Sequence, residues 1–319
     1  MAGFFALVKG AGLLINGASS LAQRLGLSEL VVGLTVVAFG TSLPEMVVNL
    51  LANYEGVSQL AIGNIIGSNI ANILLILGIS AIITPLTVRR LTVWRQVIFS
   101  ILASVILLIL VSDKFLGTGG FQGLDIIDGI ILLIFFGLFL YYTFGHRTLL
   151  STEAAESAKN SAGLSLSRAW GSIVIGSIGL GLGGQWIVSG TTTIAAGLGI
   201  GETIIGLTVV ALGTSAPELA ASIVAVKARK IDLAVGNVLG SNLFNTLWVL
   251  GLNAIVRPIP FSGDIFIDLV MGIIAALAFF LALQFIGTKR SMSKPGGVIF
   301  IAMYLLYLAY LVIREMSLI

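Results

Sequence analysis

The chain of 319 residues lacks cysteine, has a single histidine, and carries charge on only 10% of its residues. Without cysteine there is no disulfide, thiolate metal site or cysteine nucleophile, and one histidine is too few for a histidine-ligated zinc centre. The net charge is only +3, and the basic residues form no stripe. These absences exclude nucleic-acid binding as the main activity and leave covalent catalysis, and hence an enzyme, without support.

What the chain has in excess is apolar residues, which make up 57% of it and give a mean hydropathy of +1.10. A soluble chain could not bury so much apolar surface, because roughly half of its residues must face water. The composition therefore predicts an all-α, polytopic membrane protein in a lipid bilayer. About 20 residues suffice to cross the ~30 Å hydrocarbon core. Ten apolar stretches are long enough: 3–21, 29–52, 60–84, 96–112, 125–145, 168–190, 203–226, 233–256, 264–286 and 296–313.

The basic residues predict the orientation of these spans. Lys9 interrupts the first stretch and no clean cleavage site follows it, so we interpret this stretch as a retained helix and not as a signal peptide. If the chain begins outside, thirteen of the 17 Lys and Arg residues fall in cytoplasmic loops or at cytoplasmic helix ends, as the positive-inside rule requires. We expect a plasma (inner) membrane protein with both termini extracellular or periplasmic.

The chain contains an internal repeat with an offset of 173 residues. The segment GLTVVAFGTSLPEMVVNLLA from Gly33 and the segment GLTVVALGTSAPELAASIVA from Gly206 are identical at twelve of twenty positions. The segments GNIIGSNIANILLILG from Gly63 and GNVLGSNLFNTLWVLG from Gly236 are identical at nine of sixteen. Residues 33–78 thus align with 206–251 without a gap, and chance is not a serious explanation.

The repeat predicts the organisation of the chain into two halves. Each copy carries five spans, and because five is odd, the second copy enters the membrane from the opposite side, as in many secondary transporters. We expect a first five-helix repeat over 1–145, a cytoplasmic linker over 146–167 and a second five-helix repeat over 168–319. The linker is the only long polar stretch, and its His146 is interpreted as an exposed loop residue.

Two glutamates stand at equivalent positions in the repeats, Glu45 and Glu218, each about halfway along a span. A charge at that depth costs about 3 kcal/mol on insertion scales, and such residues normally mark an ion path. A pseudo-two-fold axis would bring the two carboxylates together, where they repel unless a proton or cation neutralises one of them. Glu29 and Glu202 fall instead at helix starts, where a carboxylate suits the helix dipole.

The residues before each central glutamate supply further oxygen ligands. GTSLPE and GTSAPE combine Gly with Pro44 or Pro217, which predicts a broken helix with free carbonyl groups at membrane depth. A hydroxyl pair lies on the same helical face as each glutamate. Hydroxyl, carbonyl and carboxylate oxygens are hard ligands that suit Na⁺ and Ca²⁺. The residues of these two faces are Thr41, Ser42 and Glu45, and Thr214, Ser215 and Glu218.

The second repeated motif adds amide groups. Ser68 and Asn72 are spaced i, i+4 on one face, and Ser241 and Asn245 repeat that face. We predict that these four residues belong to the ion site. For Asn64, Asn69, Asn237 and Asn242, hydrogen bonding between helices is an equally good explanation.

At these motifs the sequence resembles the cation/calcium antiporter superfamily, specifically the sodium/calcium exchangers of prokaryotic type. The resemblance covers the whole chain and implies exchange of several Na⁺, usually three, for one Ca²⁺ by alternating access, with net charge movement. It implies that Glu45 and Glu218 are the central ligands, that Thr41 and Thr214 give carbonyls to Ca²⁺, and that Asn72 and Asn245 flank the middle. It further implies one outer sodium site at Ala38, Ser42 and Ser68, a mirror site at Ala211, Ser215 and Ser241, and a sliding gate made by the first and sixth helices.

Other functions remain open at this stage. Proton/calcium exchangers of the same fold usually carry an extra acidic residue in the second motif, where this chain has GSN, and potassium-dependent members carry Asp where Asn245 stands. A proton-coupled cation exchanger is therefore the second hypothesis, and a cation channel is the third, since inverted repeats occur there too. The sequence indicates no cofactor and no obligate protein partner.

Overall fold

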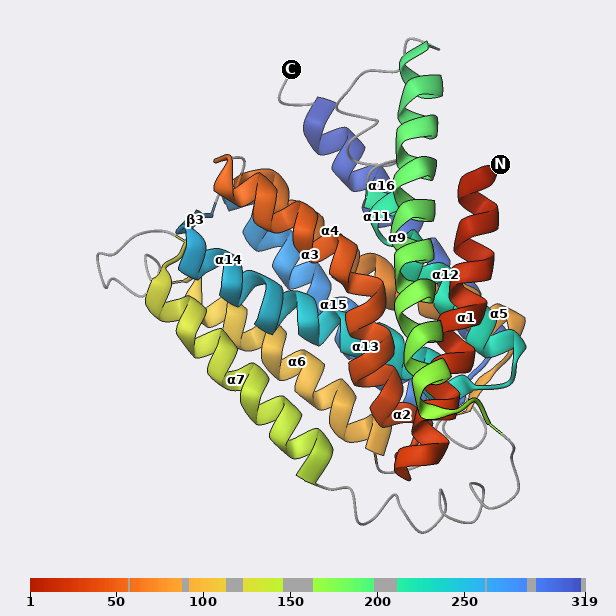
Figure 1. Cartoon of the computed structure of the whole chain (residues 1–319). Coiled ribbons are helices and arrows are strands. Elements are labelled where there is room, and N and C mark those ends of the chain that lie inside the picture. Colours follow the sequence, from red (N-terminus) through yellow and green to blue (C-terminus); the bar gives the residue numbers. More distant parts are fainter. Residues whose placement is uncertain are drawn as a thin grey trace.

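The computed structural model describes residues 1–56, 58–87, 92–112, 123–145, 163–197, 211–261, 263–285 and 291–316, and these ranges are almost entirely helical (Figure 1). The α-helices of the first half are α1 (Ala2–Leu25), α2 (Glu29–Val32), α3 (Ala38–Tyr54), α4 (Ser58–Ala71), α5 (Leu77–Ile83), α6 (Thr92–Leu110) and α7 (Ile126–Gly145). Those of the second half are α9 (Leu166–Gly197), α11 (Ala211–Thr214), α12 (Ala216–Lys227), α13 (Ile231–Leu243), α14 (Leu250–Val256), α15 (Gly263–Phe285) and α16 (Lys294–Met316). Three π-helical segments, η1 (Gly33–Val37), η2 (Asn72–Ile76) and η4 (Phe244–Val249), join consecutive α-helices.

Eight helical runs in the described ranges are long and apolar enough to span a membrane: 2–25, 29–54, 62–83, 126–145, 166–194, 231–256, 265–284 and 294–314. They coincide with eight of the ten expected stretches, so the chain is an integral membrane protein. The fourth expected stretch corresponds to the shorter apolar helix Arg95–Leu110. The seventh is described only from Ala211, where α11 and α12 follow each other. Most of the expected linker, with His146, and also Glu202 lie outside the described residues.

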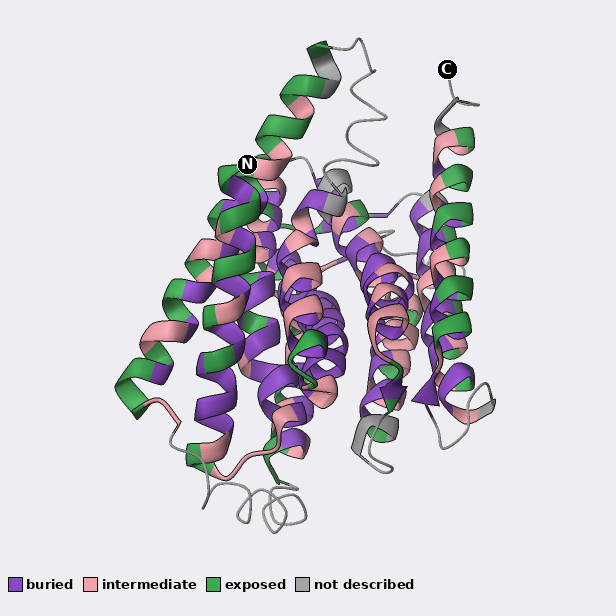
Figure 2. Ribbon diagram, turned by 90° about the vertical axis from the view of Figure 1, so that its right-hand side faces the viewer, coloured by how far each residue is buried: buried purple, intermediate pink, exposed green. Residues whose placement is uncertain are grey.

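Burial separates central from peripheral helices. In an apolar window of 18 residues within the run Ile231–Val256, 83% of residues are buried, against 28% in the corresponding window of Leu166–Ile194, so α13 lies at the centre and α9 at the edge. Figure 2 shows the same division, with purple residues gathered on the inner helices and green residues on the outward faces of the outer ones. The beginning of α1 and the end of α16 lie toward the same end of the bundle in Figures 1 and 2.

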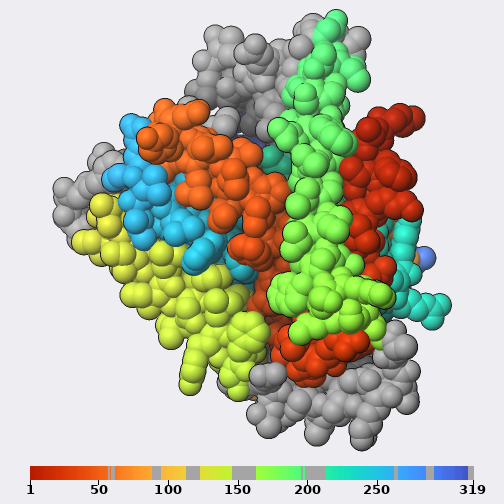
Figure 3. Space-filling view, in the orientation of Figure 1, coloured from red at the N-terminus to blue at the C-terminus, as the bar shows by residue number. Residues whose placement is uncertain are grey.

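Helices α1 and α9 pack along most of their length through glycine (Figure 3). A Cβ atom on Gly176 would lie 2.5 Å from the backbone nitrogen of Leu14, and one on Gly10 would lie 2.8 Å from the carbonyl oxygen of Gly176. Without a hydrophobic force between helices in lipid, such close backbone approach is what holds membrane helices together. The two helices therefore form one tightly packed pair, which we call the α1–α9 pair.

Two further glycine crossings tie each half of the chain to the other. Gly78 of α5 meets Gly297 of α16, and Gly251 of α14 meets Gly129 of α7; a Cβ on either α5 or α14 glycine would lie 3.1 Å from the carbonyl oxygen of its partner. The strands follow the same pattern: β1 (Leu86–Thr87) pairs with β4 (Ser291–Met292), and β2 (Gly123–Leu124) pairs with β3 (Ile259–Pro260), both antiparallel. Gly78 and Gly251, like β1 and β3, are equivalent by the 173-residue offset, whereas their partners Gly129 and Gly297, like β2 and β4, are related by an offset of 168 residues. The two halves thus make equivalent contacts.

The two proline motifs differ in local structure. In the second copy the helix is interrupted at Ser215, between α11 and α12, as the sequence predicts. In the first copy the predicted break is absent, because α3 continues through Pro44 and the irregular turn lies earlier, in η1. Gly181 of α9 stands against the proline ring, with its Cβ position 2.9 Å from Pro44 Cγ, and leaves room for the ring on a continuous helix.

The glycine packing of the α1–α9 pair predicts a specific sensitivity. Gly176→Ala should lower the unfolding temperature in detergent, because the new methyl group must push α1 away, and overpacking costs about 1–3 kcal/mol. Gly171→Ala on the same helix is the control, since nothing lies within 4 Å of its Cβ position. That substitution should be neutral or stabilising by up to ~1 kcal/mol. Equal unfolding temperatures for the two variants would contradict this packing.

Candidate cation-binding site

Two buried carboxylates lie side by side at the centre of the bundle. Glu45 on α3 is 2% exposed and Glu218 on α12 is fully buried. Ser42, one turn before Glu45, donates a hydrogen bond to Glu218 Oε1 at 2.9 Å, so α3 presents its own glutamate next to that of α12. Within the described ranges, no Lys, Arg or His side chain bonds either carboxylate. The negative charge therefore has hydroxyl and amide partners but no cationic one.

The four repeated serines surround these carboxylates. Ser68 of α4 donates to Glu45 Oε1, and Ser215 donates to Ser68 at 3.3 Å. The Ser42 hydroxyl that donates to Glu218 also lies 3.0 Å from the Ser241 hydroxyl oxygen of α13. The hydroxyls thus pair differently from the grouping that the resemblance implies. Ser42 lies with Ser241 and Ser68 with Ser215, because α3 faces α13 and α4 faces the turn before α12.

Four of the six asparagines of the second motif, Asn69, Asn72, Asn242 and Asn245, meet between α4 with η2 and α13 with η4. The Asn245 amide donates to Glu45 Oε2 at 3.3 Å and to Asn69 Oδ1 at 3.3 Å. Asn72 makes the mirror contact, donating to Asn242 Oδ1 at 2.9 Å. Asn72 begins η2 and Asn245 lies in η4, and π-helical turns of this kind are frequent at functional sites. The π turns leave the amides directed at the interface between the two halves.

The threonines are held by relays that run across the halves. Thr41 donates to Asn237 Oδ1 at 3.1 Å, and Asn237 in turn donates to Ser222 at 3.1 Å. The carbonyl oxygen of Ala38, 3.2 Å from the Thr41 hydroxyl, is a second acceptor within reach of the same hydrogen.

In the equivalent relay Thr214 donates to Asn64 Oδ1 at 3.0 Å, and Asn64 donates to Asn49 at 3.2 Å. Ala38 is buried beside α13, and Ala211 begins α11. The structure therefore brings the predicted Thr, Ser, Glu and Asn residues of both motifs to one region of the bundle.

Several polar residues of this region were not singled out from sequence. Asn49 and Ser222 end the two relays, and Thr246 accepts the Asn69 amide at 2.9 Å. Asn49 and Ser222 differ in identity but are equivalent by the 173-residue offset, and that shared polarity was the available signal. Asn64, Asn69, Asn237 and Asn242, for which two explanations stood open, all bond across helices that carry the site.

The arrangement leaves oxygen atoms free for a cation. Glu218 Oε2, Asn72 Oδ1 and Asn245 Oδ1 are buried and have no hydrogen-bond partner. No cluster of three or more His, Cys, Asp or Glu residues occurs among the described residues, so the donors are two carboxylates with hydroxyl, amide and carbonyl oxygens. Such hard, partly neutral oxygen sets suit Na⁺ and Ca²⁺ better than soft metals. Two buried carboxylates without a cationic partner can hold a cation at the centre of the bundle.

A helical membrane bundle with unpaired carboxylates at its centre belongs to the class of ion-transporting membrane proteins. The family model "Sodium/calcium exchanger protein" matches residues 1–145 and 168–313. The chain therefore belongs to the sodium/calcium exchanger protein family.

Two relatives and one solved structure match over nearly their full length. The chain is 34% identical to the inner membrane protein YrbG of Escherichia coli K12, covering 97% of this chain and 94% of that protein. It is 29% identical to the sodium/calcium exchanger MaX1 of Methanosarcina acetivorans, covering 97% and 96%. A solved structure of the sodium-calcium exchanger NCX_Mj, soaked with zero Na⁺ and Ca²⁺, superimposes with a TM-score of 0.79 at 30% identity, covering 97% of this chain and 96% of that one.

The Thr41 relay predicts that Asn237 supports the site structurally. Asn237→Ala should lower the free energy of unfolding on the order of 2 kcal/mol, because it removes an acceptor of the buried Thr41 hydroxyl and the amide that donates to the buried Ser222 hydroxyl. Thermal unfolding in detergent measures this. Ser104→Ala is the matched control, since that hydroxyl bonds only the Ser100 carbonyl of its own helix, and its effect should stay within about 0.5 kcal/mol. A variant at Asn237 as stable as the control would refute the relay.

Proposed function

We propose that the protein is a secondary antiporter that exchanges Na⁺ for Ca²⁺ by alternating access. The observation that carries this proposal is the pair of buried carboxylates, Glu45 and Glu218, whose only partners in the described ranges are hydroxyl and amide groups. Family membership and the likeness to NCX_Mj support the choice of ions. The ions are substrates, and the site requires no cofactor.

We further propose ten spans arranged as two inverted repeats, over 1–145 and 168–319, with 146–167 as the cytoplasmic linker. Contacts that are exchanged between equivalent residues support this symmetry. Ser42 with Ser241 corresponds to Ser215 with Ser68, and Asn72 with Asn242 corresponds to Asn245 with Asn69. The two threonine relays and the two strand pairs correspond in the same way. A common end for both termini is consistent with an even number of spans, and the basic loops favour termini outside.

The ligand sets follow the observed pairing of the side chains. In this proposal Ca²⁺ lies between Glu45 and Glu218, with carbonyl oxygens of Thr41 and Thr214. One outer Na⁺ lies near Glu218 with Ser42, Ser241 and Ala38, and its mirror lies near Glu45 with Ser68, Ser215 and Ala211. Asn72 and Asn245 flank the middle, and amides at both positions favour a carrier that needs no potassium.

The first test is removal of either central charge. Glu45→Gln or Glu218→Gln should reduce calcium uptake into sodium-loaded vesicles to the level of protein-free vesicles, because two negative charges are needed to balance one Ca²⁺. Glu55→Gln is the control, since Glu55 is exposed at the end of α3. This variant should exchange calcium like the parent. Sodium-driven uptake by either central variant would reject the site.

The same assay separates the competing functions. Uptake that requires internal sodium supports the proposed exchange. Uptake that follows a proton gradient, with sodium absent, would favour a proton-coupled exchanger. Calcium flux that needs no gradient of a second ion would indicate a channel.

The charge of the site predicts electrogenic exchange. Two carboxylates are neutralised by one Ca²⁺, whereas three Na⁺, the number that the resemblance implies, leave one positive charge. An empty site would have to carry two bare charges through the low-dielectric interior when the protein changes its access from one side to the other, and this costs too much. Only the forms with bound ions therefore make this change. An inside-negative potential should then favour sodium entry and calcium exit, with ~2.3 kcal/mol per charge per 100 mV. Vesicles clamped with potassium and valinomycin provide the measurement. Flux that does not change with potential would reject three-for-one coupling.

A further inference from the structure

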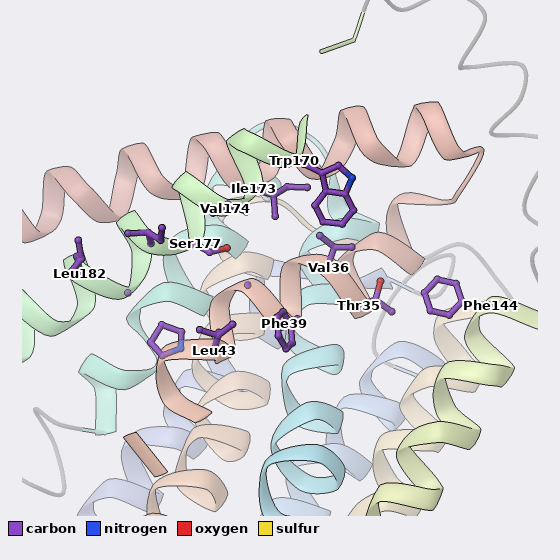
Figure 4. Close-up of a pocket in the computed structure, with 14 residues that line it drawn as sticks. Thr35, Val36, Phe39, Leu43, Phe144, Trp170, Ile173, Val174, Ser177 and Leu182 are labelled. Carbon is purple, nitrogen blue, oxygen red and sulfur yellow. The ribbon is translucent and has the colours of Figure 1, made fainter. Parts of the chain in front are cut away.

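A second cavity, separate from the carboxylates, lies between η1 with α3 and α9. It has a volume of ≈ 690 Å³ and is lined by fourteen residues, nearly all apolar (Figure 4). Figure 4 shows side chains of α9 facing Phe39 and Leu43 of α3 across the opening, with Phe144 of α7 near one end. We call this cavity the α3–α9 crevice. Volumes of this size accommodate a sizeable ligand.

Small residues create the crevice where α3 and α9 meet. A Cβ on Gly40 would lie 2.5 Å from Ser177 Oγ, and one on Gly181 would lie 2.9 Å from Pro44 Cγ. At these points the two helices touch, and the larger residues on either side leave a hollow between them. The opposite face of α9, with Gly176, is the one packed on α1.

The chemistry of the lining excludes ions and ordered water as occupants. The Thr35 hydroxyl is already bonded to the carbonyl of Val31 at 2.7 Å. Ser177 Oγ is buried and has no hydrogen-bond partner. A buried water needs two to four polar groups, and this lining offers it at most one free hydroxyl. The crevice therefore suits an apolar molecule.

The position of the crevice indicates which apolar molecule can reach it. Several lining residues also belong to the outer surface of the bundle, since Val174 is 54% and Ile178 is 57% exposed. The lining of α9 runs from Trp170 to Leu182, about 18 Å along the helix at 1.5 Å per residue. One leaflet of a ~30 Å hydrocarbon core is about 15 Å deep. In a membrane, the material in contact with such a surface is lipid acyl chain.

We propose that the α3–α9 crevice is a binding site for one acyl chain of a bilayer phospholipid. The chain fills space between the α1–α9 pair and α3. Phe39 and Leu43 separate it from Ser42, because both residues also line the small gap in which Ser42 lies. This proposal depends on the location of the protein in a membrane and not on which ions the protein exchanges.

Native mass spectrometry of the detergent-purified protein tests the site. The parent should retain one phospholipid through detergent exchange. Val174→Trp places a large ring in the crevice and should lower the occupancy about tenfold, ~1.4 kcal/mol. Ile175→Trp is the matched control: Ile175 is the next residue of α9, is 61% exposed and does not line the crevice, so this variant should retain the lipid. Ile178→Phe is a second filling variant in case Val174→Trp does not fold.

Two results would overturn the proposal. One is a parent that retains no phospholipid, and the other is equal retention by the filling and control variants. As an independent measurement, phospholipid brominated in its acyl chains should quench Trp170 fluorescence, isolated by comparison with Trp170→Phe, and the quenching should saturate at one lipid per protein. Quenching that rises without saturation would mean exchange with surrounding lipid only. Neither measurement uses transport, so failure here is distinguishable from failure of the exchange assay.

Discussion

The constraint on which the rest of the structure depends is the burial of two carboxylates in the hydrocarbon layer without a cationic side chain beside them. Glu45 and Glu218 are at most 2% exposed, and their described partners are hydroxyl and amide groups. An Arg or Lys in that place would neutralise the pair permanently and leave no role for a mobile ion. Neutral hydrogen-bond donors instead lower the cost of burial only in part. What remains is an affinity for cations that the bundle can use.

That constraint also explains why the helices that carry the site are joined across the two halves of the chain. Each glutamate accepts from a residue of the other half: Glu45 from Asn245, and Glu218 from Ser42. A cation that binds both carboxylates therefore pulls the halves together. The exchanged contacts of the serines, asparagines and threonines keep the two sides of this interface alike, and the proposed alternating access would use this likeness to open the site to either side of the membrane by similar movements.

Much of this site could be predicted from sequence because the repeat marks it twice. Glu45 and Glu218 stand out as charges inside apolar spans, and Ser68 with Asn72 as a polar face that recurs at Ser241 and Asn245. The pairing of Ser42 with Ser241 could not be predicted, since helical periodicity gives the face of a residue but not the helix opposite it. The uninterrupted α3 was also missed, because a proline in the sequence predicts a break, and the sequence does not show that the irregular turn lies earlier, in η1.

The packing of α1 and α9 differs from that of the site in the kind of contact that holds it. The site is held by many directed hydrogen bonds, whereas the α1–α9 pair meets through glycine backbones and meets α3 along a crevice lined by apolar residues. The glycine contacts are specific in their fit, but the boundary between the pair and α3 carries no hydrogen bond among the described residues, and Ser177 Oγ at this boundary has no hydrogen-bond partner. In the proposed exchange, a shift of this helix pair along the bundle would break none of the hydrogen bonds described at the site. In that proposal the polar centre fixes where an ion binds, and movement at the apolar boundary changes which side of the membrane the ion can reach.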